Sequence, residues 1–189
     1  MRRWRRLAAP AAAALALCSC SASGTPAVHH ARQAGGGTIV LSCADSAGPQ
    51  GRDVTLPVTD GVQGLAGRAD PAELMPVTGH WQIGKAFLAI APDAAPYRTV
   101  SIVRPATARL FYADPQTWGT ITNADRIAHA RTSVRLPACG RDYSGYTGGI
   151  LVQAASCVTV SISAPGGKPA VLTIPVGVSG CGETSGRSG

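Results

Sequence analysis

The chain has 189 residues and a formal net charge of +7, with 45% apolar and 14% charged residues. Four of its 17 basic residues lie within the first six positions and no basic run follows them, so the composition argues against nucleic-acid binding. Without those four arginines, 13 basic residues stand against 10 acidic ones, a net charge of about +3.

The first 20 residues have the pattern of an export signal. Four arginines precede the apolar run Leu7–Leu17, which is too short for a membrane-spanning helix of about 20 residues. The end of this run resembles the lipobox of bacterial lipoprotein signal peptides, with Leu17 and Ser19 before Cys20. The resemblance implies cleavage before Cys20, lipidation of that cysteine and anchoring at the outer face of the cell membrane. The alternative is an ordinary secretory signal, cut between Ser19 and Gly24, that releases the protein.

Residues 21–37 lack apolar periodicity and end in three glycines, as expected of a flexible tether. From residue 38 short strand patterns alternate with Gly, Pro and Asp, and Trp81 and Phe87 are expected in the core. Short helical segments are expected at Asp70–Leu74 and at Asn123–His129, the latter with Asn123 as its cap and Ile127 facing inward. The nine expected strands are Thr38–Cys43, Asp53–Thr59, Lys85–Ala91, Tyr97–Val103, Ala108–Ala113, Thr132–Cys139, Gly149–Val152, Cys157–Ser163 and Ala170–Val176.

The clearest strand pattern is a hairpin near the C-terminus. In Cys157–Ser163, Val and Ile occupy one face while Thr and Ser occupy the other. The turn Ala164–Gly167 places a proline second and Gly166 third, where a positive φ is needed. The returning strand contains Pro175, which cannot donate to a ladder, so this strand is expected at a sheet edge. Together these patterns predict an all-β protein: one β-sandwich of immunoglobulin-like architecture over residues 38–181, with little helix and a disordered tail at 182–189.

Four cysteines follow the export signal: Cys43, Cys139, Cys157 and Cys181. An even number in an exported chain indicates two disulfides. Of the three possible connectivities we favour Cys139–Cys157 with Cys43–Cys181. A four-thiolate zinc site is the alternative, but the chain lacks a C-x-x-C pair, so no metal site is predicted.

Aromatic and charged residues in two expected loops are the candidates for binding. Arg141, Tyr143 and Tyr146 lie in a Gly- and Tyr-rich stretch, and tyrosine suits recognition of carbohydrate or protein at low entropic cost. Trp118 follows a proline in the other loop. The alternative for these side chains is packing over the rim of the sandwich.

No catalytic motif is present: the chain has no G-x-S-x-G, no H-E-x-x-H and no glycine-rich phosphate loop. Folding could bring His80 or His129 next to an aspartate and a serine to form a catalytic triad. Any domain with two histidines and several aspartates permits such a triad, so the residues alone do not indicate catalysis. Asp70 and Glu73 lie three residues apart, which suits capping of a helical turn better than acid–base catalysis. We predict no enzyme and no cofactor.

The run VRLPAC at 134–139, YTGGILV at 146–152 and CVTV at 157–160 resembles a pattern in secreted or lipid-anchored actinobacterial proteins of unassigned function. The resemblance implies an envelope location and an all-β fold, and it carries no activity. The sequence therefore predicts a binding or interaction module at the outer face of the membrane, whose partner is a protein or a cell-wall glycan. The alternatives are a secreted envelope hydrolase with a histidine-dependent site and a structural subunit of an envelope complex.

Overall fold

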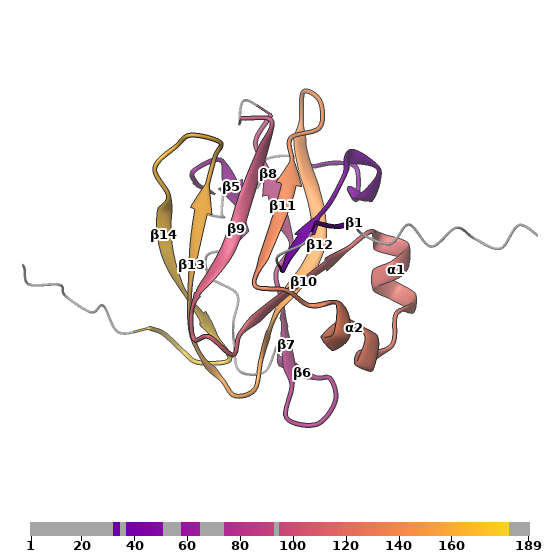
Figure 1. The fold of residues 1–189 in the computed structure, drawn as a ribbon, viewed down its shortest axis with the longest axis vertical. Coiled ribbons are helices and arrows are strands. Elements are labelled where there is room, and N and C mark those ends of the chain that lie inside the picture. The colour runs from indigo at the N-terminus through magenta and orange to yellow at the C-terminus, as the bar shows by residue number, and fades with distance from the viewer. Residues whose placement is uncertain (1–31, 35–36, 51–57, 65–73, 93–94, 182–189) are drawn as a thin grey trace, which may run out of the picture.

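The structure is a computed structural model that describes residues 32–34, 37–50, 58–64, 74–92 and 95–181. Two β-sheets pack face to face, and two short helices lie beside one of them (Figure 1). The predicted all-β sandwich is confirmed, whereas its immunoglobulin-like strand order is not. The export signal with Cys20 and the tail at 182–189 lie outside the described residues.

The first sheet has six strands and carries the C-terminal hairpin at one edge. Its second and third strands run parallel, with Ile39 opposite Val134, and its other neighbouring pairs are antiparallel. Three residues of the predicted tether form its first strand, so pairing begins before residue 38. Across the sheet the strands are β1 (Arg32–Ala34), β2 (Thr38–Val40), β11 (Ser133–Pro137), β9 (Tyr97–Arg104), β13 (Ser156–Ser163) and β14 (Ala170–Val176).

The C-terminal hairpin forms as predicted. The backbone N–H of Gly167 donates to the carbonyl of Ala164 at 3.1 Å, and Gly166 has φ +70°, as a type II turn requires. Strand β14 is the last strand of the sheet, so no further strand needs the backbone N–H that Pro175 lacks.

The second sheet is built around the ten-residue strand β12 (Tyr143–Val152). The glycine- and tyrosine-rich stretch was predicted to be a loop, and that prediction was wrong from residue 143 onward: these residues form a strand that pairs on both edges and is buried over most of its length. The other strands of this sheet are β3 (Pro49–Gln50), β4 (Val58–Thr59), β5 (Val62–Gln63), β6 (Leu74–Pro76), β7 (Gln82–Lys85), β8 (Leu88–Ile90) and β10 (Arg109–Ala113).

Strands β7 and β8 follow one another along the same edge of β12 and pair with it in a single antiparallel register. Gln82 lies opposite Val152 at one end, and Ile90 lies opposite Ser144 at the other. The predicted strand Lys85–Ala91 therefore covers only part of a longer, interrupted partner. The interruption leaves Phe87 41% exposed, so its predicted core position was wrong.

The main core fills the space between the two sheets. On β13 the apolar face predicted from the sequence is fully buried, as are Val100 of β9 and Val134 and Leu136 of β11 on the same side of the sheet. Tyr112 lies across Gly148 of the neighbouring strand and donates its hydroxyl hydrogen to the carbonyl of Ala86 at 2.8 Å. A Cβ at position 148 would lie 2.1 Å from the Tyr112 ring, so the glycine is required by the close approach of the ring.

A second core forms on the outward side of the second sheet, under α1 (Pro115–Thr120) and α2 (Asn123–His129). The predicted helix at 123–129 is confirmed, with Ile127 packed inward, but its cap is Thr122, one residue earlier. Asp114 caps α1 by accepting a hydrogen bond from the backbone N–H of Thr117 at 2.9 Å. Trp81 is half-buried and packs against this second core.

The disulfides join Cys43 to Cys139 and Cys157 to Cys181, so the favoured pairing was wrong. The first bridge follows from the parallel pair of β2 and β11, because strands that run parallel end at the same side of the sheet and bring the residues after them together. In the second, Cys157 lies in β13 at the open end of the β13–β14 hairpin, close to the chain that leaves β14. A short η1 turn, Cys43–Asp45, leads away from the first bridge.

Candidate binding surface

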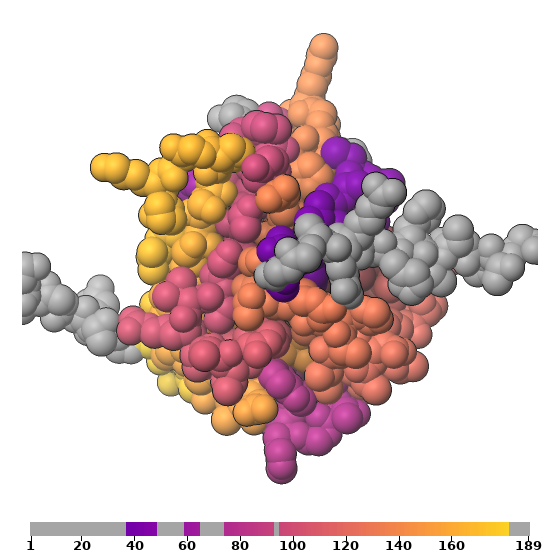
Figure 2. All heavy atoms as spheres, viewed as in Figure 1, coloured from indigo at the N-terminus to yellow at the C-terminus, as the bar shows by residue number. Residues whose placement is uncertain are grey.

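The outward side of the six-stranded sheet carries a set of small hydroxyl side chains. On β13 and β9 the Ser and Thr residues alternate with buried apolar residues and point away from the core. Ser161 lies opposite Ser101, and Ser163 lies opposite Thr99. We call Thr99, Ser101, Ser161 and Ser163 the hydroxyl patch. The spacing of strands and of alternate residues makes it about 5 Å by about 7 Å between its corners. Figure 2 views the molecule from this side.

The four hydroxyl groups of the patch make no hydrogen bond to the described part of the protein. The hydroxyls on either side of them do: Thr38 and Ser133 share a hydrogen bond of 2.6 Å, and so do Thr159 and Thr173 at 3.1 Å. All four patch residues are half-buried, so their side chains hold fixed positions while the hydroxyls still reach solvent. Each hydroxyl can donate one hydrogen bond and accept two.

Arg104 reaches this surface because of a bulge in β9. The register shifts between Thr159, opposite Arg104, and Val160, opposite Ile102, so Val103 is an extra residue. In a regular strand without the bulge, Arg104 would lie on the same inward face as Ile102. Its Nε instead donates to the Thr159 hydroxyl at 2.9 Å, which fixes the guanidinium beside the hydroxyl patch.

A second arginine adjoins the patch on the other neighbour of β9. Arg135 lies opposite Thr99, and its guanidinium carbon lies 4.4 Å from the centre of the Tyr97 ring. An arginine over an aromatic face keeps its N–H groups at the rim of the stack, free for other acceptors. Arg135 is exposed, and in the described chain it makes no hydrogen bond through its side chain.

The outward side of the six-stranded sheet is positive because the arginines of its described strands are not balanced by acidic residues of those strands. Strands β2, β9, β11, β13 and β14, whose side chains the structure describes, contain three arginines and no Asp or Glu. Two of these arginines, Arg104 and Arg135, are exposed on the outward side. The arrangement can therefore donate many hydrogen bonds and attract negative charge.

The third arginine, Arg98, points inward and joins the two sheets. Its Nε donates to the backbone carbonyl of Asp60 at 2.7 Å and lies 3.4 Å from the carboxylate of the same residue. Its Nη1 is buried without a hydrogen-bond partner among the described residues. Asp60 and Gly61 both have positive φ and form the two-residue turn between β4 and β5.

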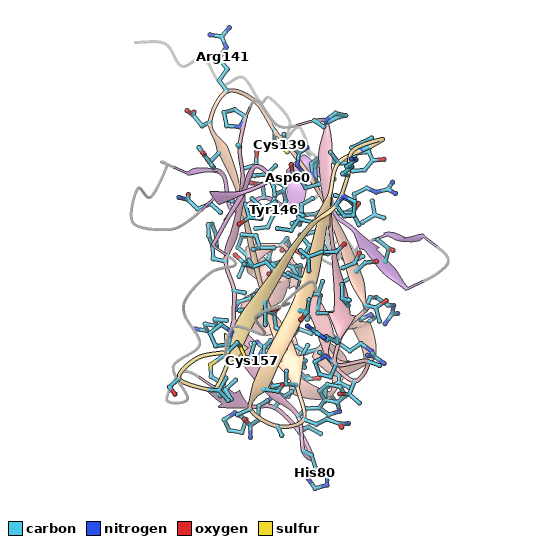
Figure 3. The ribbon with its side chains drawn as sticks, turned by 90° about the vertical axis from the view of Figure 1, so that its left-hand side faces the viewer. Asp60, His80, Cys139, Arg141, Tyr146 and Cys157 are labelled. Carbon is cyan, nitrogen blue, oxygen red and sulfur yellow. A yellow bond between two sulfur atoms is a disulfide. The ribbon has the colours of Figure 1, made fainter. Side chains whose placement is uncertain are left out.

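The predicted binding residues do not gather at one place. Tyr146 is fully buried and donates its hydroxyl hydrogen to the carbonyl of Pro137 at 2.7 Å, so it is not available to a ligand. Burial and the nearby charge of Asp45 raise the pKa of its phenol. Tyr143 is half-buried at the start of β12, and Arg141 is exposed in the β11–β12 connection, which joins the two sheets (Figure 3).

Trp118 lies in α1 and not in a loop. Its ring stacks on Phe111 with centroids 5.6 Å apart, and the Arg126 guanidinium lies 5.0 Å from it on α2. Arg126 also donates to the Trp118 carbonyl at 2.8 Å. This side chain thus joins both helices to the second sheet, which is a structural role.

The two histidines of the domain lie at different places in the fold. His80 is exposed in the β6–β7 turn, at the opposite end of the molecule from Arg141 (Figure 3). His129 is exposed at the end of α2. Within the described ranges no three His, Cys, Asp or Glu side chains are grouped as metal ligands would be. The carboxylates Asp70 and Glu73 lie outside those ranges.

The chain matches no protein-family model, no curated protein and no solved structure. The two disulfides indicate an oxidising compartment outside the cytoplasm. Among the described residues no helix has the length and apolar character needed to cross a membrane.

The sequence predicts the β13 half of this surface. The alternation in Cys157–Ser163 places its Thr and Ser residues on the side away from the core, although the sequence does not mark them as a site. The partner hydroxyls on β9 became neighbours only through strand pairing, and the bulge at Val103 has no signature in composition or periodicity.

Proposed function

We propose that this protein is a non-catalytic binding module, exported and held at the outer face of the cell membrane by a lipid on Cys20. Its recognition surface is the hydroxyl patch with Arg104 and Arg135. The export pattern of the first 20 residues supports the location, and the disulfides agree with it.

The observation that carries this proposal is the difference between the outward sides of the two sheets. On the second sheet, α1 and α2 bury a second core against β7, β10 and β12. On the first sheet, hydroxyl groups without a hydrogen-bond partner among the described residues lie between two exposed arginines. Polar groups fixed by a rigid sheet, with unused hydrogen-bonding capacity, are what a binding surface requires.

The test is sedimentation of the purified full chain with isolated cell envelopes. The variant Thr99→Glu with Ser161→Glu places two negative charges in the patch. We expect it to lower envelope binding at least about tenfold, because a bound ligand would have to desolvate both carboxylates and because they can pair with the patch arginines. The matched control, Gln116→Glu with Ala124→Glu, adds the same charge at exposed positions in the first turns of α1 and α2, where negative charge is tolerated.

Both variants must melt within a few degrees of the parent protein for the comparison to hold. Equal binding by the patch variant and the control contradicts the proposal, as does a parent protein that does not sediment with envelopes. A stable complex with one protein, unaffected by the patch variant, would support a structural subunit instead.

A further inference from the structure

We infer that the ligand of this surface is an anionic glycan, a sugar polymer that carries carboxylate or phosphate groups. The inference rests on the proposed function, because it assigns a ligand class to the same surface. Three properties of the surface lead to it: free hydroxyl groups, positive charge without compensating carboxylates, and the distance between the two arginines.

The hydroxyl patch matches a ligand that is itself rich in hydroxyl groups. Ser and Thr can donate to and accept from the same partner, as sugar hydroxyls can, so each contact can form in either direction. Two exposed apolar side chains of the described strands of this sheet adjoin the patch: Val171 lies opposite Ser161 on the edge strand, and Val103 lies in the bulge beside Arg104. Protein interfaces favour aromatic residues and Met at their centres and are depleted in Ser, so the composition favours a glycan over a protein.

The two arginines specify negative charge on the ligand. Arg104 uses its Nε for Thr159, and its two Nη groups make no bond to the described chain. Arg135 is held against Tyr97, and its N–H groups make no hydrogen bond to the part of the chain that the structure describes. A guanidinium oriented in this way can bind a carboxylate or a phosphate through two parallel hydrogen bonds. No acidic residue in the described strands of this sheet competes for them.

The distance between the arginines indicates a polymer. Arg104 lies opposite Thr159 of β13. Arg135 lies opposite Thr99, which in turn lies opposite Ser163 of β13. Thr159 and Ser163 are four residues apart, so the two arginines are separated by about 13 Å along the strand direction, with the patch between them. One small anion cannot bind both arginines. A chain laid along β9 can contact both with anionic groups and fill the patch with the sugar hydroxyls between them.

The experiment measures the affinity of the purified full chain for defined polymers at 0.15 M NaCl. Polygalacturonate supplies carboxylates, and a glycosylated poly(glycerol phosphate) supplies phosphodiesters. Methyl-esterified polygalacturonate has the same backbone without charge, and poly-glutamate has charge without sugars. We expect at least one of the two anionic glycans to bind at least about tenfold more tightly than the ester and than poly-glutamate. Which of the two binds identifies the anionic group.

Variants localise the binding. Arg104→Gln and Arg135→Gln should each weaken binding of the anionic glycan about fivefold, and the double variant about 25-fold, since the contacts lie apart. Arg141→Gln removes the same charge in the β11–β12 connection and should change the affinity by less than twofold. Thr99→Val, which keeps the shape but removes a patch hydroxyl, should weaken binding while leaving the melting temperature unchanged.

The outcomes separate this inference from the proposed function. If the ester or poly-glutamate binds as tightly as the best anionic glycan, or if Arg141→Gln loses as much affinity as the patch variants, the inference is wrong. If neither anionic glycan binds while the protein still binds envelopes through the patch, the inference is wrong and the proposed function stands. If the patch variants change neither interaction, both are wrong.

Discussion

Removal of the Cys43–Cys139 bridge tests the arrangement of the fold most sharply. This disulfide joins residues separated by 96 positions, and the second bridge joins residues separated by 24. Each bridge lowers the entropy of the unfolded chain by closing a loop. For loops of these lengths this stabilises the folded state by about 4.7 kcal/mol for the first bridge and about 3.4 kcal/mol for the second. Because domains of this kind are stable by about 5–15 kcal/mol, loss of the first bridge should remove a large part of the total.

The assay is urea unfolding at 25 °C of Cys43→Ser with Cys139→Ser, compared with Cys157→Ser with Cys181→Ser. The first variant should lose more free energy of unfolding than the second, by about 1 kcal/mol on the same loop-closure argument. Thiol mapping of the single variant Cys43→Ser provides the decisive control. The structure predicts a free thiol at Cys139. A free thiol at Cys181 would instead support the pairing favoured from sequence and refute the reasoning from the parallel strands.

Three further predictions concern single contacts. Gly148→Ala should destabilise the fold by about 3 kcal/mol or more in urea unfolding, because the new Cβ overlaps the Tyr112 ring; a loss below about 1 kcal/mol would contradict this contact. Asp60→Asn keeps a residue that tolerates positive φ but removes the carboxylate beside buried Arg98, so it should cost about 1–3 kcal/mol, and an unchanged melting curve would refute the pairing. Burial raises the pKa of Asp114, but hydrogen bonds from Thr117 and the backbone outweigh it, so its pKa is lowered. The stability that it contributes should be present at neutral pH and should decrease as pH falls below about 4 through the lowered pKa. Asp114→Ala should therefore cost about 1 kcal/mol at pH 7 and progressively less in acid; a cost independent of pH would argue against an ionised cap.

Local patterns predicted local structure well. The period-2 alternation of Cys157–Ser163, the turn at Ala164–Gly167 and the edge position implied by Pro175 are all present, because each depends on residues close in sequence. The helix at Asn123–His129 is also correct for the same reason. An available signal was missed at Asp60–Gly61, a residue pair typical of a two-residue hairpin turn.

Long-range pairing was not predictable from the same patterns. The four glycines between Gly140 and Gly149 suggested a loop, yet Gly148 and Gly149 lie in β12 because the Tyr112 ring and the backbone of Gly84 approach them closely. The disulfide connectivity depended on the parallel pairing of β2 with β11, which no local pattern reveals. The candidate binding surface likewise combines strands distant in the chain.

The tyrosines of the predicted loop illustrate why composition alone misplaced the binding residues. Tyrosine suits both recognition and the interior of a sandwich, and the strand register decides between them. Tyr146 has inward parity in β12 and is buried, whereas Tyr97, not considered from sequence, lies on the outward side beneath Arg135. A residue type was therefore informative only once its sheet face was known.

The central claim is that the outward side of the six-stranded sheet binds a ligand. Amide and arginine side-chain NMR signals of the isotope-labelled chain, followed during titration with oligogalacturonate and with a glycosylated oligo(glycerol phosphate), test it most directly. The account predicts that at least one ligand shifts the signals of the hydroxyl patch and the Nε signals of Arg104 and Arg135. Shifts confined to Arg141 and the β11–β12 connection, shifts centred on α1 and α2, or no shifts with either ligand would contradict it.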